Sequence, residues 1–169
     1  DRVAIFAHNS MDVFVTQFAC QRLGAIFLPI NWRLAVPEIK FVIDDAKPKA
    51  FIFDTEFASQ IKELKKIFEA LQFISKDSEH LEYSEFDKGI AAAAGDDVIP
   101  AEVYLDDVWS ILYTSGTTGS PKGAMITYGM VLFNALNMTI ATRMTSSSKG
   151  LSFLPTFHVG GLNLYANPL

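Results

Sequence analysis

Residues 3–30 read VAIFAHNSMDVFVTQFACQRLGAIFLPI, and this stretch decides the fold. Residues 3–7 and residues 26–30 are short apolar runs with the length of buried strands. Between them lies a helical pattern that follows Ser10, the expected N-cap, and stops before Gly24, where a left-handed C-cap would fall. Its apolar residues at helical spacing are Met11, Phe14, Val15, Phe18, Ala19 and Leu23. A strand, a helix and a strand with short connections imply two parallel strands, so the sequence predicts an α/β fold with a mainly parallel sheet and helices on both faces.

The same pattern continues along the chain. Pro37 stands in the expected first turn of a helix over residues 38–46, and residues 50–53 form another apolar run. Residues 56–71 predict one amphipathic helix whose charged face is solvated.

The chain divides into three parts. Residues 1–75 form a first α/β segment, and the acidic, irregular residues 76–107 are expected to connect it to a second segment, residues 108–169. That second segment opens with an apolar strand at residues 108–112.

Composition narrows the class of protein. The chain has 169 residues, of which 50% are hydrophobic, and this excludes a disordered or fibrous protein. Its 14 Lys and Arg against 19 Asp and Glu give a net charge of −5, the wrong sign for a nucleic acid as the main partner. The single cysteine, Cys20, cannot form an internal disulfide, and its apolar surroundings indicate a buried thiol.

Two windows of twenty residues, 123–142 and 150–169, contain no Asp, Glu, Lys or Arg. Their length would suit a membrane span. Polar residues interrupt the first window, and Pro155 and Gly160 break the second. We therefore expect buried globular segments and no transmembrane segment. Because so much apolar sequence needs a packing partner, we interpret the chain as a fragment.

Residues 113–123 read YTSGTTGSPKG and follow the predicted strand at residues 108–112. Gly116 and Gly119 permit positive φ, so that successive backbone N–H groups can point into one concavity and receive phosphate oxygens. Lys122 adds a point charge for the same anion. Hydroxyl donors come from Thr114, Ser115, Thr117 and Thr118. The segment therefore predicts a polyphosphate site.

A Walker A loop is excluded, although the spacing from Gly116 to Lys122 matches its pattern. Where that motif needs a glycine with a free N–H, this chain has Pro121, which has none. Where it needs a hydroxyl on Mg²⁺, this chain has Gly123.

Residues 113–123 resemble the phosphate loop of the adenylate-forming (AMP-binding) enzymes, which include acyl-CoA synthetases, aryl-CoA ligases, amino-acid adenylation domains and firefly luciferase. Two further stretches are similar to the family pattern. Residues 23–39 contain an Asn-x-Arg loop at positions 31–33, and residues 154–162, LPTFHVGGL, contain the Pro-x-Phe-His segment that borders the acyl pocket. The resemblance covers the whole chain and implies that residues 1–169 are part of a large N-terminal AMP-binding domain, without its C-terminal part and the C-terminal domain.

The resemblance implies a two-step reaction. A carboxylate attacks the α-phosphate of ATP to give an acyl-adenylate and pyrophosphate, and the thiol of CoA then displaces AMP. Mg²⁺ is expected on the nucleotide, with no protein ligand assigned to it. The implied catalytic residues are Lys122 and His158, the latter beside the carboxylate and the α-phosphate. The residues implied to hold the ATP phosphates are Thr114, Ser115, Gly116, Thr117, Thr118, Gly119 and Lys122.

His158 bears on which class of carboxylic acid the resemblance implies as substrate. Amino-acid-activating members usually carry an Asp there to pair with the substrate ammonium, and an imidazole cannot replace that charge. We therefore expect an acyl or aryl acid, with a fatty acid preferred over an aromatic acid such as a coumarate or a succinylbenzoate. Apolar candidates for the pocket wall are Phe157, Val159, Leu162 and Leu164, for which core packing is the alternative.

A second hypothesis stays open, that the chain binds nucleotide without catalysing a reaction. The family's later elements, which include a C-terminal catalytic lysine, find no match after Gly123. The oligomeric state is also left open, with a homodimer as one candidate, and a cytoplasmic location is expected. His8 and His80 match nothing in the family pattern and are interpreted as structural.

Overall fold

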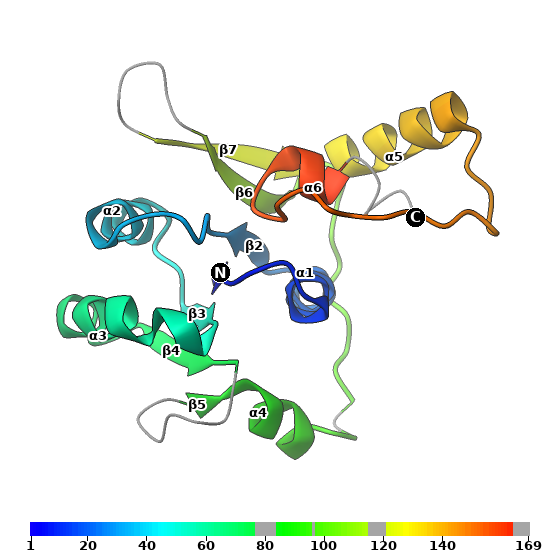
Figure 1. Cartoon of the computed structure of the whole chain (residues 1–169). Coiled ribbons are helices and arrows are strands. Elements are labelled where there is room, and N and C mark those ends of the chain that lie inside the picture. The colour runs from blue at the N-terminus through cyan, green and yellow to red at the C-terminus, as the bar shows by residue number, and fades with distance from the viewer. Residues whose placement is uncertain (77–83, 96, 115–120, 164–169) are drawn as a thin grey trace.

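The computed structural model describes residues 1–76, 84–95, 97–114 and 121–163, and its strands form one sheet of seven in the order β5-β4-β3-β1-β2-β6-β7 (Figure 1). The strands are β1 Arg2–Phe6, β2 Ile26–Pro29, β3 Ala50–Phe53, β4 Gln72–Ser75, β5 Ser84–Glu85, β6 Val108–Thr114 and β7 Lys122–Thr127. All neighbouring pairs are parallel except β6 and β7, which pair antiparallel. The predicted mainly parallel sheet is confirmed.

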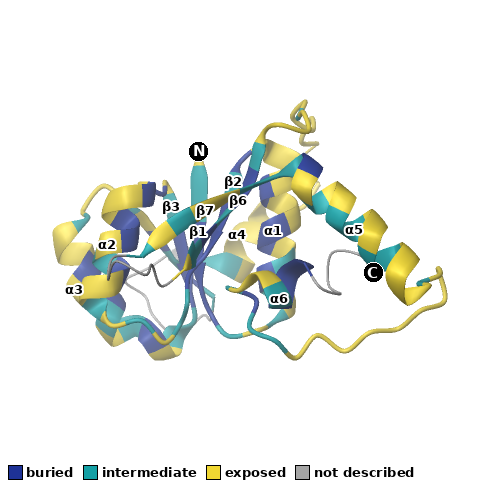
Figure 2. Ribbon diagram, turned by 90° about the horizontal axis from the view of Figure 1, so that it is seen from above, coloured by how far each residue is buried: buried dark blue, intermediate teal, exposed yellow. Residues whose placement is uncertain are grey.

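Helices cover both faces of this sheet, as predicted. Figure 2 shows α2 and α3 on one side of the strands and α1, α4 and α6 on the other, while α5 projects from the body. The helices are α1 Met11–Leu23, α2 Val36–Ala46, α3 Ala58–Ile67, α4 Phe86–Ala92, α5 Tyr128–Thr142 and α6 Val159–Asn163, with a short 3-10 turn η1 Thr55–Phe57 before α3.

The central strands are apolar on both faces because both faces are covered. Phe51 packs into the core under α2 and α3, whereas its neighbour Ile52 packs into the core on the side of α1. Phe27 and Leu28 divide in the same way and are both 0% exposed. Burial of each such side chain stabilises the fold by about 1.5–3 kcal/mol.

The first helix has the predicted bounds, and Gly24 ends it with a positive φ of 63°. Its buried face differs from the expected one. The residues of α1 that pack against the sheet are Val13, Thr16, Gln17 and Cys20, while much of the apolar stripe points outward, with Met11 74% and Phe18 55% exposed. The helical spacing gave the helix correctly and its buried face wrongly. Cys20 is 2% exposed and burial raises its pKa to about 12, which agrees with the predicted buried thiol.

Ser10 occupies the N-cap position but makes no capping hydrogen bond. Its Oγ instead accepts a hydrogen bond from Lys76 Nζ at 3.1 Å. The same ammonium lies 2.7 Å from Asp54 Oδ1 and 3.0 Å from Asp12 Oδ2. Burial alone would lower the pKa of Lys76, but its hydrogen bonds to the two carboxylates outweigh burial and raise that pKa. This cluster ties the start of α1 to the carboxyl ends of β3 and β4.

Three boundaries differ from the predictions. The single helix expected over residues 56–71 is η1 followed by α3, and the chain then enters β4 at Gln72. The region 76–107 is more than a connection, because it contains β5 and α4. After the glycine-rich segment the chain forms β7, a strand that the sequence analysis does not predict, before α5 begins.

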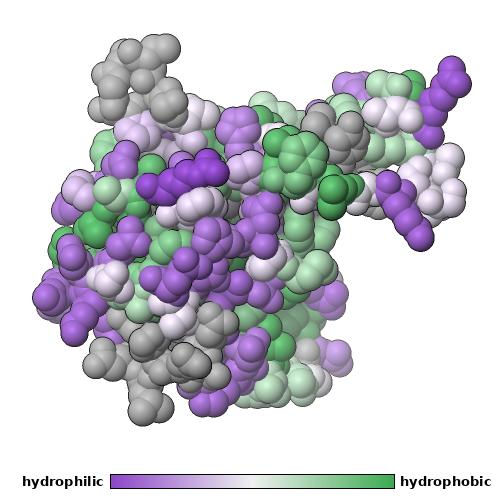
Figure 3. All heavy atoms as spheres, in the orientation of Figure 1, coloured by the Kyte–Doolittle hydropathy of each residue, from purple (hydrophilic) through white to green (hydrophobic). Residues whose placement is uncertain are grey.

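The helix α5 is exposed although its sequence predicted burial. Phe133 is 60% and Ile140 is 76% exposed, and only Gly129 is buried. Apolar side chains also gather over α6 on the face shown in Figure 3. Within the described parts of the chain, no helix combines the length and apolar character that a bilayer span requires.

Candidate active site

The predicted phosphate loop, residues 113–123, includes the adjacent ends of β6 and β7, which form an antiparallel hairpin. In this hairpin Thr114 pairs with Lys122 and Tyr113 pairs with Gly123. Thr114 and Lys122 are both exposed and form the last pair before the connecting segment, and this pair, a hydroxyl opposite an ammonium, is called the hairpin mouth. The predicted residues Ser115, Gly116, Thr117, Thr118 and Gly119 lie outside the described residues.

Gly123 is explained by packing. A Cβ at this position would lie 2.8 Å from Ile111 Cγ2 and 3.2 Å from Tyr113 Cζ. The glycine therefore lets the Tyr113 ring lie across β7, and the phenol hydroxyl donates a hydrogen bond to Asp45 Oδ2 of α2 at 2.5 Å. Sequence reasoning missed this bond, because nothing in the motif points to a partner 68 positions away.

A pocket of about 270 Å³ lies beside the hairpin mouth. The residues that line it are Pro29, Ile30, Asn31, Leu34, Glu38, Val42, Tyr113, Thr114, Pro121, Phe157 and His158. These residues include members of all three stretches that carry the family resemblance. Because β2 and β6 are parallel, their carboxyl ends reach the same edge of the sheet, which is where α/β proteins bind ligands.

The Asn-x-Arg loop forms one wall of this pocket. Asn31 Oδ1 accepts a hydrogen bond from the Arg33 backbone N–H at 3.0 Å, which closes a tight turn. The Arg33 guanidinium carbon lies 4.6 Å from the centre of the Trp32 ring and 5.8 Å from that of Phe157. The loop thus places the positive charge of Arg33 beside Phe157, which belongs to the opposite wall of the pocket.

His158 lies on that opposite wall and is exposed. Its Nδ1 accepts a hydrogen bond from the Gly160 backbone N–H at 3.2 Å, so the neutral ring carries its proton on Nε2. Its own backbone N–H donates to the Pro155 carbonyl at 3.1 Å. The structure therefore brings His158 and Thr114 to one pocket, while Lys122 stands beside Thr114 at the hairpin mouth.

The apolar residues predicted as candidates for the pocket wall occupy different environments in the structure. Phe157 lines the pocket, Leu162 is a fully buried core residue, and Val159 is exposed outside the pocket lining. Leu164 lies outside the described residues.

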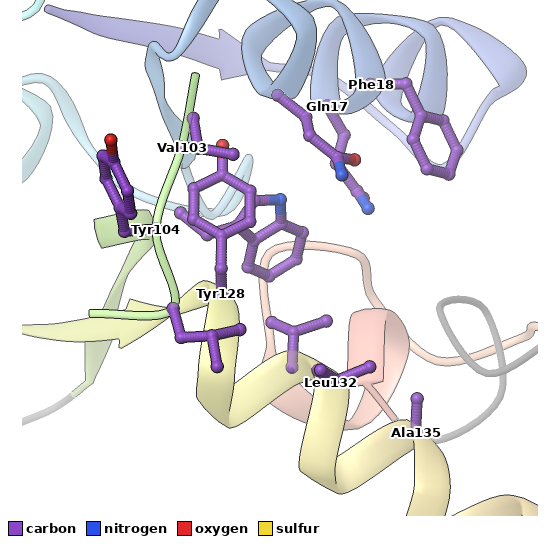
Figure 4. Close-up of a pocket in the computed structure, with 11 residues that line it drawn as sticks. Gln17, Phe18, Val103, Tyr104, Tyr128, Leu132 and Ala135 are labelled. Atoms are coloured by element: carbon purple, nitrogen blue, oxygen red, sulfur yellow. The ribbon is translucent and has the colours of Figure 1, made fainter. Parts of the chain in front are cut away.

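A second cavity of about 400 Å³ separates α1 from α5 (Figure 4). Gln17 and Phe18 face it from α1, and Tyr128 and Leu132 face it from α5. None of the predicted site residues that the structure describes lines it, and most of its walls are apolar. Its chemistry is that of a core interface and does not suit a phosphate group.

A family model matches almost the whole chain. The family model described as AMP-binding enzyme matches residues 1–168. The chain belongs to the AMP-binding enzyme family. It is 33% identical over 168 residues to the indoleacetate–CoA ligase of Aromatoleum aromaticum, covering 98% of this chain and 32% of that protein. The chain thus spans about a third of the length of this curated relative.

Solved structures of AMP-binding enzymes share the fold. The ATP-bound MatB of Rhodopseudomonas palustris superposes with a TM-score of 0.83 at 29% identity, over 99% of this chain and 33% of that one. The o-succinylbenzoate CoA synthetase MenE of Bacillus subtilis, in complex with ATP and magnesium ion, gives a TM-score of 0.76 at 26% identity, over 96% of this chain and 40% of that one.

Removal of the Tyr113 hydroxyl provides a test of the hairpin geometry. Tyr113→Phe is expected to lower the free energy of unfolding by about 1 kcal/mol, because the hydrogen bond to Asp45 is lost. Burial raises the pKa of Tyr113, and the hydrogen bond to Asp45 and its charge raise that pKa further. The folded protein therefore keeps the phenol neutral, and this part of the stability is complete below the unfolded pKa of about 10 and is lost as the pH rises above it.

The measurement is denaturant unfolding of wild type and Tyr113→Phe at pH 8 and at pH 11. We expect the wild type to be more stable at pH 8 and its advantage to shrink at pH 11. An advantage that stays constant between the two pH values would contradict the assigned environment of Tyr113.

Proposed function

We propose that this chain forms part of the N-terminal domain of an AMP-forming ligase that joins a carboxylic acid to CoA. The observation that carries the proposal is the meeting of the hairpin mouth, the Asn-x-Arg loop and the Phe-His segment at one pocket on the carboxyl edge of the sheet. The family membership supports it, because the relative with 33% identity is named as a CoA ligase.

The first chemical step creates negative charge that this site is suited to hold. A carboxylate oxygen attacks the α-phosphorus of ATP, and the bond to the bridging oxygen breaks as pyrophosphate leaves with the electron pair. Thr114 and Lys122 stand at the hairpin mouth, where a hydroxyl and an ammonium can follow the β- and γ-phosphates as charge develops. In the second step the CoA thiol gives up its proton to solvent, its sulfur attacks the acyl carbon, and the acyl C–O bond breaks so that AMP leaves with the electron pair.

His158 is proposed to act at the acid. It lines the pocket next to Phe157, and its Nε2 holds the donor proton of the neutral ring. A hydrogen-bond donor at this place can hold the substrate carboxylate toward the α-phosphate, and this orientation speeds the first step. Mg²⁺ is proposed to arrive with the ATP phosphates, and the MenE structure named as a complex with ATP and magnesium ion supports this.

We propose an aromatic carboxylic acid as the substrate in place of a fatty acid. The fatty-acid expectation rested on apolar side chains of which Phe157 alone, among those described, lines the pocket. Two aromatic residues, Tyr113 and Phe157, line it together with the aliphatic residues Ile30, Leu34 and Val42. The names of the indoleacetate and succinylbenzoate ligases support the same class of acid.

The test is acid-dependent exchange of labelled pyrophosphate into ATP by the complete protein that carries this chain. Indoleacetate and 2-succinylbenzoate are compared with hexanoate and palmitate, with and without Mg²⁺. Exchange with an aromatic acid and Mg²⁺ is the expected result. Exchange with fatty acids alone would reverse the choice of acid, and no exchange with any acid would contradict the ligase function. Exchange by the 169-residue chain itself would exclude the hypothesis that it only binds nucleotide.

A further inference from the structure

The turn that follows β1 contacts the two segments that supply the walls of the pocket. Its two residues His8 and Asn9 are consecutive, but their side chains engage different elements. His8 lies against Trp32 of the Asn-x-Arg loop, and Asn9 binds the segment that precedes Phe157. Because β1 is an inner strand with a parallel neighbour on each side, this turn stands on a rigid part of the sheet.

Both the nitrogen and the oxygen of the Asn9 side-chain amide form hydrogen bonds with residues 154–156. Its Nδ2 donates to the Leu154 carbonyl at 2.8 Å, and its Oδ1 accepts from the Thr156 backbone N–H at 3.0 Å and from Thr156 Oγ1 at 3.1 Å. Thr156 is 3% exposed, so its hydroxyl needs this partner. One side chain therefore fixes the backbone directly before Phe157 and His158.

His8 holds the opposite wall. Its ring centre lies 4.3 Å from that of Trp32, and Trp32 carries the guanidinium of Arg33 at 4.6 Å. The turn is itself anchored, because the His8 backbone N–H donates to Asp54 Oδ2 at 2.8 Å and the His8 Nε2 lies 3.0 Å from Glu56 Oε1. The distance between the two walls is thus set from one place in the sheet.

We infer that Asn9 is a positioning residue for the acid end of the active site, acting through residues 154–156 on Phe157 and His158. The inference rests on the proposed function, since it assigns Phe157 and His158 to the substrate acid. Asn9 does not line the pocket, so its effect must pass through the segment that it holds. Misplacement of a reacting group by about 1 Å is enough to cost roughly a hundredfold in rate.

The experiment measures pyrophosphate exchange by the complete protein with Asn9→Ala. We expect a roughly tenfold to hundredfold loss of kcat/KM for the acid, with the KM for ATP changed less than about twofold. In a double-mutant cycle, Asn9→Ala should add little to the loss caused by His158→Ala, because the segment that it places has then lost its functional group. Full additivity of the two losses would overturn the inference.

Thr156 supplies a matched pair of variants. Thr156→Val keeps the shape and removes the hydroxyl donor, whereas Thr156→Ser keeps the donor and removes a methyl group. A role through the Asn9 contact predicts impaired acid kinetics for Thr156→Val and near-normal kinetics for Thr156→Ser. The opposite order would indicate packing alone and would overturn the inference. This pair decides the question even where Asn9→Ala fails to fold.

Ser10→Ala is the control for the turn. Ser10 follows Asn9 in sequence, but its hydroxyl bonds to Asp12 and Lys76 and does not contact residues 154–156. Acid KM should stay at the wild-type value in this variant. A wild-type protein without exchange would count against the proposed function, whereas an active wild type with unchanged Asn9→Ala and Thr156→Val variants would count against this inference alone.

Discussion

Replacement of Lys122 by alanine is expected to slow ATP-dependent adenylation by roughly a hundredfold to a thousandfold, the loss typical of one donor that acts on transition-state charge. Lys122 is exposed, is the first residue of β7 and pairs with Thr114. Its ammonium can therefore stabilise the negative charge that develops on the pyrophosphate leaving group. The free energy of unfolding should change by less than about 0.5 kcal/mol, because an exposed side chain contributes little to the core. Pyrophosphate exchange and denaturant unfolding of Lys122→Ala measure the two quantities.

Two further variants sharpen this test. Thr118→Val removes a hydroxyl that sequence analysis assigns to the ATP phosphates, and we expect it to weaken ATP use in the same direction as Lys122→Ala. Lys62→Ala removes an exposed ammonium from α3, a helix that contributes no residue to the pocket lining, and should leave exchange unchanged. Global unfolding of Lys122→Ala would show that Lys122 has a structural role, and an equal loss in Lys62→Ala would show that the effect is not specific to the phosphate loop.

The first half of the sheet could be predicted because its local signals agree with its tertiary environment. Residues 50–53 are apolar at every position, and β3 occupies the same residues with both faces buried. Gly24 ended the first helix where its left-handed conformation was expected. The end of α3 was missed because Ile67 and Leu71 continue a helical spacing, and only the pairing with β3 decides that residues 72–75 extend as a strand.

The buried faces of α1 and α5 could not be predicted from spacing. Both helices carry apolar residues on more than one side, and such helices are normally covered by more than one neighbour. The side of α1 that carries Val13 and Cys20 packs against the sheet, so Phe18 on another side faces the cavity between α1 and α5. Periodicity identifies an apolar stripe, but it does not tell which of two stripes meets the sheet.

The sequence predicts the functional groups of the site but not the residues that hold these groups in place. The motif residues Thr114 and His158 were named from chemistry and resemblance, and the structure places both at one pocket. Asn9 is not predicted as a site residue, because its hydrogen-bond partners are 145 and 147 positions away in the sequence. The available signal was its place directly after a predicted parallel strand, since such carboxyl ends are where site residues collect.

The Phe-His segment also depends on one glycine. An added Cβ at Gly161 would lie 2.0 Å from the Pro155 carbonyl oxygen and 2.8 Å from the Leu154 carbonyl oxygen. These are backbone atoms and cannot rotate away, so Gly161→Ala must displace α6 from residues 154–155. At Gly160 the nearest atom to an added Cβ is Leu154 Cδ1 at 3.2 Å, the end of a flexible side chain. The two neighbouring glycines therefore form a matched pair with the same change in composition.

We expect Gly161→Ala to lower the free energy of unfolding by about 1–3 kcal/mol, the usual cost of overpacking. Acid-dependent exchange should fall roughly a hundredfold, because the Pro155 carbonyl that must move also accepts the backbone hydrogen bond of His158. Gly160→Ala should stay within about 1 kcal/mol of wild type and keep most of its activity, since alanine also favours the helix. Thermal unfolding and pyrophosphate exchange of both variants give the comparison. Equal behaviour of the two would mean that α6 and residues 154–158 can separate without loss, so that the close packing at Gly161 does not set the position of His158.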